Sequence, residues 1–206
     1  HGVFPMALRG FHAPQEFLFV KIYFAAPKQH VCALPEHAHD VTRAEIPFRR
    51  RDARGQETLS MAGERFLRSG VDPATAMKIL NSVMLLRNGD EWGFATVDLM
   101  CVDLFTGETS FYKYGAAPSY VRSGGSVRRV SGESLAAGLV AGEGAAPDVV
   151  RMRLKPGSLA VIASDGVISG GDDAWLRELM RSTPEEKDMK TLAREVLRKA
   201  ADECGT

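Results

Sequence analysis

The sequence lacks a surplus of charge of either sign, because 26 lysines and arginines balance 26 aspartates and glutamates in its 206 residues. A nucleic-acid-binding surface usually shows as an excess of basic residues, and an acidic disordered tail as an excess of acids. Since neither excess is present, we expect no nucleic-acid partner. The function must be sought in a local site.

Cysteines and long apolar runs are also scarce. Cys32, Cys101 and Cys204 lie far apart and are odd in number, which favours reduced thiols in the cytoplasm over a disulfide framework. The apolar run over residues 17–26 is interrupted by Lys21, and it is about half of the roughly 20 residues that a membrane-spanning helix needs. We therefore expect a cytoplasmic domain, with any membrane anchor of a longer parent protein lying outside this chain.

What the sequence does contain is enough apolar material, 45% of its residues, for one domain with a core. The composition changes near residue 50: all five histidines but only two of the 20 glycines precede it. We expect residues 1–50 to be an irregular segment outside the family sequence, with one strand over 17–24. Residues 51–206 should form the domain.

Residues 56–87 have the pattern of a helical hairpin. The first helix should end at Ser69-Gly70, where glycine can adopt the left-handed cap conformation. The second should begin at Asp72-Pro73, an N-cap followed by a proline in the first turn. Its apolar residues recur at helical spacing: Ala76, Ile79, Leu80, Val83 and Leu86. The two helices should pack side by side on one layer.

Short strands separated by turn signals follow the hairpin. They are expected over 93–104, 108–114, 119–122, 126–130, 149–154 and 158–164. The short connections without helices favour antiparallel pairing. Two more helices are expected, over 172–180 and 185–201. Helices, then a strand meander, then helices indicate an α+β domain built in layers.

A candidate site lies at the end of the last strand, where an apolar run delivers Ser164, Asp165 and Gly166. Such a strand end places a carboxylate where the core meets solvent, and the glycine permits a turn and close approach of a ligand. Mg²⁺ and Mn²⁺ prefer oxygen ligands of this kind. An Asp-Gly pair is also a common turn signal, so the residues alone leave a metal ligand and a plain turn open.

A rival metal site is a histidine-rich stretch near the start of the chain. Neutral imidazoles, a thiolate and a carboxylate can bind zinc tetrahedrally. The residues concerned are His30, Cys32, His37, His39 and Asp40. Their spacing is not one of the strong zinc patterns, and there is no second cluster, so a small zinc-binding module is the less favoured reading.

The order of several motifs resembles the C-terminal phosphatase domain of the stage II sporulation protein E family, which is part of the metal-dependent PPM class of serine/threonine phosphatases. No single motif is diagnostic, but their order extends over residues 56–201. The motifs are Glu64-Arg65-Phe66-Leu67, Ile79-Leu80-Asn81-Ser82, Phe94-Ala95-Thr96-Val97-Asp98-Leu99, Val102-Asp103-Leu104-Phe105-Thr106-Gly107-Glu108, Tyr114-Gly115-Ala116-Ala117-Pro118-Ser119, Leu154-Lys155-Pro156-Gly157 and Ser164-Asp165-Gly166-Val167.

This resemblance implies α-β-β-α layers, with a mostly antiparallel β-sandwich flanked by helices and some edge elements missing. It implies two divalent ions, Mn²⁺ or Mg²⁺, held between the sheets by aspartates. By position, Asp165 would be a metal ligand and Gly166 would shape the turn beside it. Thr96 and Asp98 map to a strand near that site, where their side chains could equally fill the core.

The implied activity is hydrolysis of phosphoserine on a regulatory protein of the anti-anti-sigma type. A homodimer is a further partnership that the resemblance leaves open. No covalent catalytic residue is implied, because the family's nucleophile is a metal-activated water.

Two expected metal-binding motifs are not found. Where the family has Asp-Gly-Met-Gly-x-Gly, this sequence has Arg49-Arg50-Arg51 beside Asp52, and the arginines would repel a cation. The family's Asp-Asp-Met-Thr strand is also absent, and Asp172-Asp173 suits helix capping better. We therefore expect two metals to bind poorly. The alternative function is a catalytically inactive remnant that acts as a binding or regulatory module.

Overall fold

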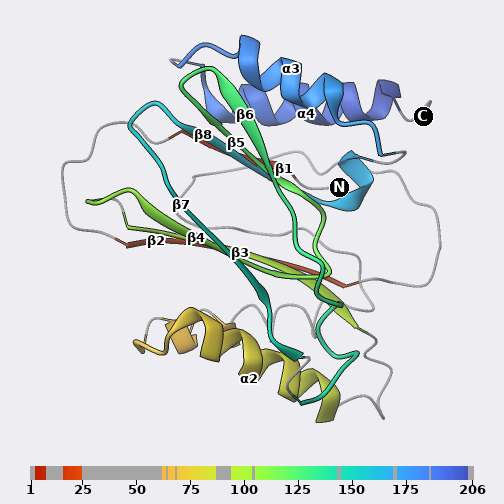
Figure 1. Cartoon of the computed structure of the whole chain (residues 1–206). Coiled ribbons are helices and arrows are strands. Elements are labelled where there is room, and N and C mark those ends of the chain that lie inside the picture. The colour runs from red at the N-terminus through yellow and green to blue at the C-terminus, as the bar shows by residue number, and fades with distance from the viewer. Residues whose placement is uncertain are drawn as a thin grey trace.

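The structure is a computed structural model that describes residues 3–7, 16–24, 62–63, 65–67, 69–86, 94–103, 105–142, 145–168, 171–185 and 187–203. The helices and strands labelled in Figure 1 are β1 (Val3–Ala7), β2 (Glu16–Phe24), α2 (Pro73–Leu86), β3 (Ala95–Asp103), β4 (Glu108–Tyr114), β5 (Ser119–Ser123), β6 (Ser126–Val130), β7 (Asp148–Arg153), β8 (Leu159–Ala163), α3 (Ala174–Ser182) and α4 (Met189–Glu203). A 3-10 turn, η2 (Asp165–Val167), lies between β8 and α3.

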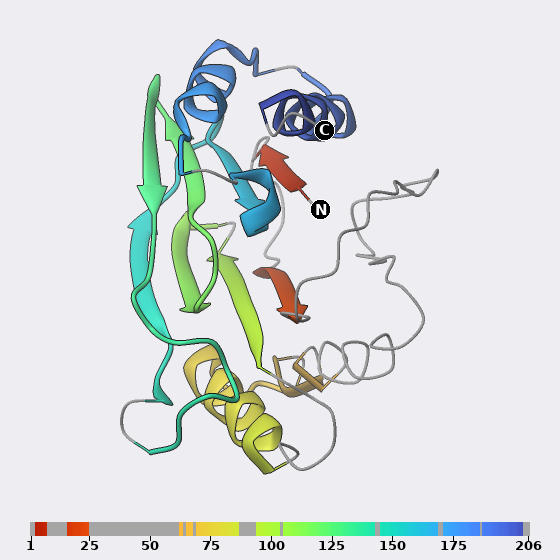
Figure 2. The same ribbon diagram turned by 90° about the vertical axis from the view of Figure 1, so that its right-hand side faces the viewer.

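The strands form two sheets that face each other. One has the order β1-β8-β5-β6 and is called here the β5–β8 sheet; the other has the order β2-β3-β4-β7 and is called the β3–β4 sheet. Every described strand pair is antiparallel. Helices α3 and α4 cover the outer face of the first sheet, and α2 covers the outer face of the second (Figure 2). The predicted α+β layers are confirmed.

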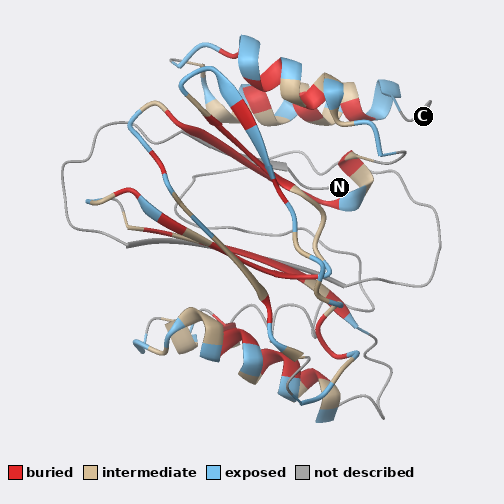
Figure 3. Ribbon diagram, in the orientation of Figure 1, coloured by how far each residue is buried: buried red, intermediate tan, exposed pale blue. Residues whose placement is uncertain are grey.

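Apolar clusters lie in all three spaces between the four layers, and Figure 3 marks the buried residues along the sheets and helices that face these spaces. The cluster between the sheets contains Met100, Phe111 and Ile162, whereas Leu159 and Val161 face α3 and α4. Because both faces of the β5–β8 sheet are covered, all of β8 is buried and its sequence reads as a continuous apolar run rather than an alternating one.

The predicted helix ends are confirmed in detail. Gly70 has φ +82°, and the amides of Gly70 and Val71 donate to the carbonyls of Leu67 and Phe66, which is the Schellman arrangement. Asp72 Oδ1 then accepts the amide of Ala74 at 3.0 Å, as an N-cap does. These local signals fix where α2 begins.

The predicted buried face of α2 is wrong at its C-terminal end. Leu86 is 86% exposed, while the fully buried apolar residues include Met77, Leu80 and Met84. Both stripes have helical spacing, so periodicity alone could not choose between them. Contact with Ala95, Val97 and Leu99 of β3 decides the matter, since it selects the methionine side of the helix.

Two strands lie within the segment that we expected to be mostly irregular. The strand predicted over 17–24 is present as β2, paired with β3. The second, β1, was not predicted, and it contains Pro5. Proline is tolerated at a sheet edge, and β1 is an edge strand paired with β8 alone. Residues 8–15 and 25–50 lie outside the described residues.

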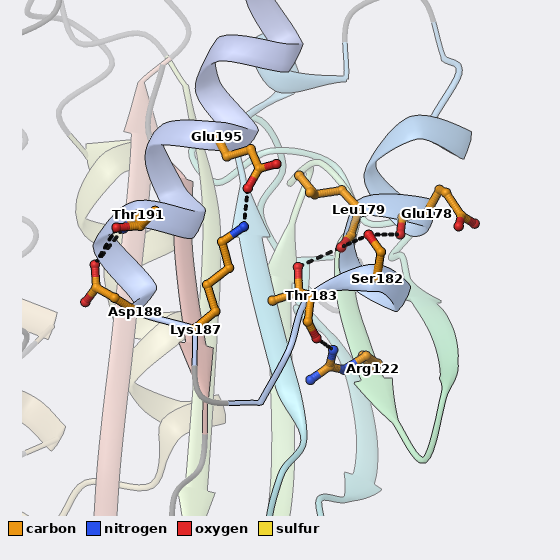
Figure 4. Close-up of polar contacts among 9 residues, drawn as sticks. All are labelled: Arg122, Glu178, Leu179, Ser182, Thr183, Lys187, Asp188, Thr191 and Glu195. Carbon is orange, nitrogen blue, oxygen red and sulfur yellow. Dashed lines mark hydrogen bonds and ion pairs between the residues drawn. The ribbon is translucent and has the colours of Figure 1, made fainter.

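Strand β5 anchors both ends of α3 through its outward side chains. The Tyr120 hydroxyl donates to Asp173 Oδ2 at 2.8 Å, at the start of the helix. Arg122 Nη1 donates to the carbonyl of Met180 at 2.9 Å and to that of Thr183, so a buried cation meets the negative end of the helix dipole. The contact of Arg122 with Thr183 is drawn in Figure 4.

The connection from α3 to α4 is held by polar contacts as well (Figure 4). Lys187 pairs with Glu195 in the second turn of α4, and Asp188 Oδ2 accepts the amide of Thr191 at 2.8 Å as an N-cap. The two helices are thereby fixed as one layer. None of the helices that the structure describes is long and apolar enough to cross a membrane.

Two turn glycines allow a matched test of this fold. Gly107 (φ +75°) and Gly124 (φ +55°) are both left-handed, but a Cβ at Gly107 would collide with the Leu154 carbonyl oxygen, whereas nothing lies within 4 Å of one at Gly124. We expect Gly124→Ala to cost about 1–2 kcal/mol of unfolding free energy from backbone strain. Gly107→Ala should cost about 2 kcal/mol more. Urea denaturation checks this, and equal losses would contradict the register of β4 with β7.

Candidate functional site

The predicted carboxylate lies where the sequence placed it, directly after β8. Asp165 is exposed and opens η2, and its Oδ1 accepts the amide of Gly166 at 2.9 Å. The amides of Val167 and Ile168 donate to the carbonyls of Ser164 and Asp165, both at 3.0 Å. Gly166 thus lies inside a right-handed turn, and the turn presents the carboxylate to solvent.

A second polar cluster lies between the sheets, and we call its three members, Asp98, Lys113 and Ser119, the inter-sheet clasp. Lys113 Nζ is 2.5 Å from Asp98 Oδ2 and donates to Ser119 Oγ at 2.9 Å. Ser119 Oγ in turn donates to Asp98 Oδ2 at 2.5 Å. All three side chains are within 1% of complete burial. Charges that are buried away from water are found in proteins when they are paired and hydrogen-bonded, as these are.

The electrostatics of the clasp are dominated by burial. Loss of water lowers the pKa of Lys113 below its ordinary value of 10.5, and the attraction of Asp98 only partly offsets that effect. Removing one partner would leave the other charged and unpaired in the core. The pair is therefore an obligate unit.

Two buried oxygen atoms in this region have no hydrogen-bond partner among the described residues: Asp98 Oδ1 and Ser164 Oγ. Ser119 is the register partner of Ile162, two residues before Ser164. Because side chains alternate along a strand, Ile162 and Ser164 share the face that looks toward the other sheet. Buried oxygen atoms without a hydrogen-bond partner are rare in proteins, and they indicate a place where a further polar group can form a hydrogen bond.

The described residues do not fit the two-ion site that the resemblance implied. No group of three or more histidine, cysteine, aspartate or glutamate side chains is placed there to hold a metal ion. One oxygen of Asp98, Oδ2, is taken up by Lys113 and Ser119. Asp172 Oδ1 accepts the amide of Ala174, the first residue of α3, at 2.9 Å. Asp173 is the N-cap residue, but its side chain makes no capping bond and accepts the Tyr120 hydroxyl instead.

Other predicted candidates fall outside the described residues. These are Asp52 with its three arginines, and the zinc candidates His30, Cys32, His37, His39 and Asp40. Cys101 lies half-buried on β3, while Cys32 and Cys204 fall outside the described residues. Thr96 is half-buried on β3.

Lys113 and Ser119 were missed by the sequence reasoning, although a signal for the lysine exists. Along β4 the inward positions are Thr109, Phe111 and Lys113, so a lysine stands where an apolar residue is expected. A lysine on the buried face of a strand requires a carboxylate, and Asp98 on the neighbouring strand is the nearest candidate. For Ser119 no comparable signal exists.

Comparison with known proteins decides the family. The family model for Stage II sporulation protein E (SpoIIE) matches residues 57–206, which is more than half of the chain. The chain belongs to the SpoIIE family. It is thus a domain of the PPM class of serine/threonine phosphatases, as the motif order suggested.

Two curated relatives agree with this assignment. SpoIIE of Bacillus subtilis (strain 168) is 33% identical over 130 residues, covering 61% of this chain and 15% of the relative. SpoIIE of Priestia megaterium is 32% identical over 139 residues, covering 63% and 23%. The chain therefore spans less than a quarter of the length of these SpoIIE relatives.

Solved structures show the same fold. The PP2C phosphatase domain of Bacillus subtilis SpoIIE with a fragment of its regulatory domain has a TM-score of 0.61 and 27% identity, over 71% of this chain and 44% of that one. The PPM Ser-Thr phosphatase MsPP from Mycobacterium smegmatis has a TM-score of 0.55 and 20% identity, over 75% and 78%. The latter supports the fold alone.

The obligate nature of the Lys113 pair can be tested by comparing partial and complete removal. Lys113→Met should cost about 3–5 kcal/mol of unfolding free energy, because it leaves Asp98 charged and unpaired. The triple variant Asp98→Leu/Lys113→Met/Ser119→Ala removes all three polar groups and should recover most of that loss. Guanidinium denaturation gives both values. A triple variant less stable than the single one would contradict the pairing.

The same pair predicts a pH dependence of stability. Since the pKa of Lys113 is lower in the folded than in the unfolded protein, the unfolded state binds more protons between the two values. The unfolding free energy should therefore rise with pH across that window, up to about 10.5. Tyr114, whose pKa burial raises to about 12, gives the opposite slope in every variant. The rise in unfolding free energy should vanish in the triple variant. If the triple variant has the same pH profile as the unmodified chain, Lys113 is not its cause.

Proposed function

We propose that this chain is the phosphatase domain of a metal-dependent protein serine/threonine phosphatase that acts on phosphoserine of a regulatory protein of the anti-anti-sigma type. The observation that carries the proposal is the match of the SpoIIE family to residues 57–206 together with an exposed Asp165 at the end of β8. A cytoplasmic domain within a membrane-anchored parent fits this role.

The family's chemistry explains why metal ions belong in the proposal. Hydrolysis of a phosphate monoester is very slow in water, and a pair of Mn²⁺ or Mg²⁺ ions supplies an activated water and neutralises the phosphoryl oxygens. In this chain Asp165 would contribute one carboxylate, and the η2 turn would hold that carboxylate at the surface. The remaining ligands must come from outside the described residues.

A second function is favoured by a specific observation, namely that Asp98 is ion-paired with Lys113 through Oδ2 and that the described residues offer no cluster of metal ligands. On this reading the chain binds a partner without turning over a substrate. Ala62, Phe66 and Leu67 pack with α2 in the apolar cluster on the β3–β4 sheet, so such a module would keep its shape without metal.

Phosphatase assays with added ligands separate the two functions. We expect the 206-residue chain to hydrolyse p-nitrophenyl phosphate negligibly with millimolar Mn²⁺. Inserting the family's Asp-Gly-Met-Gly-x-Gly segment in place of residues 49–54 and appending an Asp-Asp-Met-Thr strand should create metal-dependent turnover, because paired cations need several oxygen ligands. A repaired chain that stays inactive while it binds a partner would support the second function.

Two substitutions in the repaired chain test the role of Asp165. Asp165→Asn removes a charge at nearly constant shape and should weaken Mn²⁺ binding by at least about tenfold, with loss of most turnover. Asp103→Asn is the matched control: its Oδ1 accepts the amides of Phe105 and Thr106 in a turn, which an asparagine oxygen can also do. Turnover in the unrepaired chain, or full activity of Asp165→Asn, would show that the site is assigned wrongly.

A further inference from the structure

The two sheets are joined by a polar contact that depends on a single hydroxyl group. Asp98 and Lys113 are register partners on adjacent strands, so their ion pair lies within the β3–β4 sheet. Ser119 is the first residue of β5, in the other sheet, and it contacts both Asp98 and Lys113. Without the Ser119 hydroxyl, the pair would remain but would no longer hold the β5–β8 sheet.

Ser119 is also next to the strand that carries the candidate metal ligand. Its register partner on β8 is Ile162, and the chain runs from there through Ser164 to Asp165. The backbone ladder between β5 and β8 therefore transmits the position of Ser119 to the turn η2.

The apolar contacts between the sheets define the position of β8 relative to the β3–β4 sheet less precisely than the clasp does. The inter-sheet cluster is apolar, with Met100, Phe111 and Val121 among its members, and apolar attraction has no direction. Hydrogen bonds require a distance near 3 Å and a near-linear angle, so the clasp accepts one arrangement of the sheets. A buried ion pair adds little net stability, which leaves placement as its main contribution.

We propose that Ser119 is a positioning residue: its hydroxyl, held by Asp98 and Lys113, fixes the end of β8 and hence Asp165 relative to the β3–β4 sheet. The importance of Asp165 rests on the proposed function. The link itself rests on the contacts of the clasp.

Native-state hydrogen exchange of the full chain tests the link with Ser119→Ala. The reporters are the amides of Val167 and Ile168, which donate to Ser164 and Asp165 in η2. Loss of one buried hydrogen-bonding group should speed their exchange about tenfold, while amides in α2, on the far side of the β3–β4 sheet, change much less. The ¹³C chemical shift of the Asp165 carboxyl should move with them.

Ser158→Ala is the matched control, because Ser158 is a buried serine just before the opposite end of β8 and its hydroxyl bonds to Ser123 and Lys155. It should leave Val167 and Ile168 unchanged. Ser119→Thr keeps the hydroxyl and should restore slow exchange at both amides.

The proposal is overturned if Ser119→Ala has no effect at η2, if it speeds all amides equally, if Ser158→Ala acts in the same way, or if Ser119→Thr fails to restore slow exchange. None of these readouts involves metal or substrate. A failure of the phosphatase proposal would therefore leave the exchange result intact, and the reverse also holds.

Discussion

A lysine ammonium group that is fully buried constrains the arrangement of the strands around it. Lys113 needs a carboxylate and a hydroxyl within hydrogen-bonding distance, and Asp98 and Ser119 provide them. A slip of β3 by one residue would bring Val97 or Leu99 to face β4 at this place and leave the charge unpaired. The clasp thus specifies the register of β3 with β4 and the seating of one sheet on the other.

Strand β5 carries this constraint outward to the helices. Its inward residues, Ser119 and Val121, contact the opposite sheet, while its outward residues, Tyr120 and Arg122, bind the two ends of α3. Because its side chains alternate between the two faces of the sheet, β5 contacts both the β3–β4 sheet and helix α3. The position of η2, which lies between β8 and α3 in the chain, is determined from both sides.

Most of the fold could be predicted because its signals are local. Glycine turns and two-residue alternation located β4 and β6 at their observed bounds, whereas α4 begins four residues after the predicted start at 185. The division of strands between two sheets could not be predicted, because the short connections suit pairing within a sheet and crossing between sheets equally well. Strand β1, which contains Pro5, was not predicted, and the exposed Leu86 shared its spacing with the stripe that packs.

The candidate site was predictable only where a single segment defines it. Asp165 follows an apolar strand and lies at its end, as expected. The partner of Asp98 depends on the register of β3 with β4, and the contact with Ser119 depends on how two sheets are stacked. Neither contact can be predicted from a local sequence pattern. Asp98, which the resemblance mapped to a strand near the site, forms an ion pair with Lys113.

The pairing of β1 with β8 has a consequence for how the chain acquires its fold. Ser123 pairs with Ser126 in a tight turn, whereas Val3 pairs with Ala163 near the other end of the sequence. Contacts between distant segments form slowly because the intervening chain must first be ordered. During synthesis β1 therefore leaves the ribosome long before its partner β8. This edge of the sandwich, next to the strand that leads to Asp165, can close only after about 160 residues have been made.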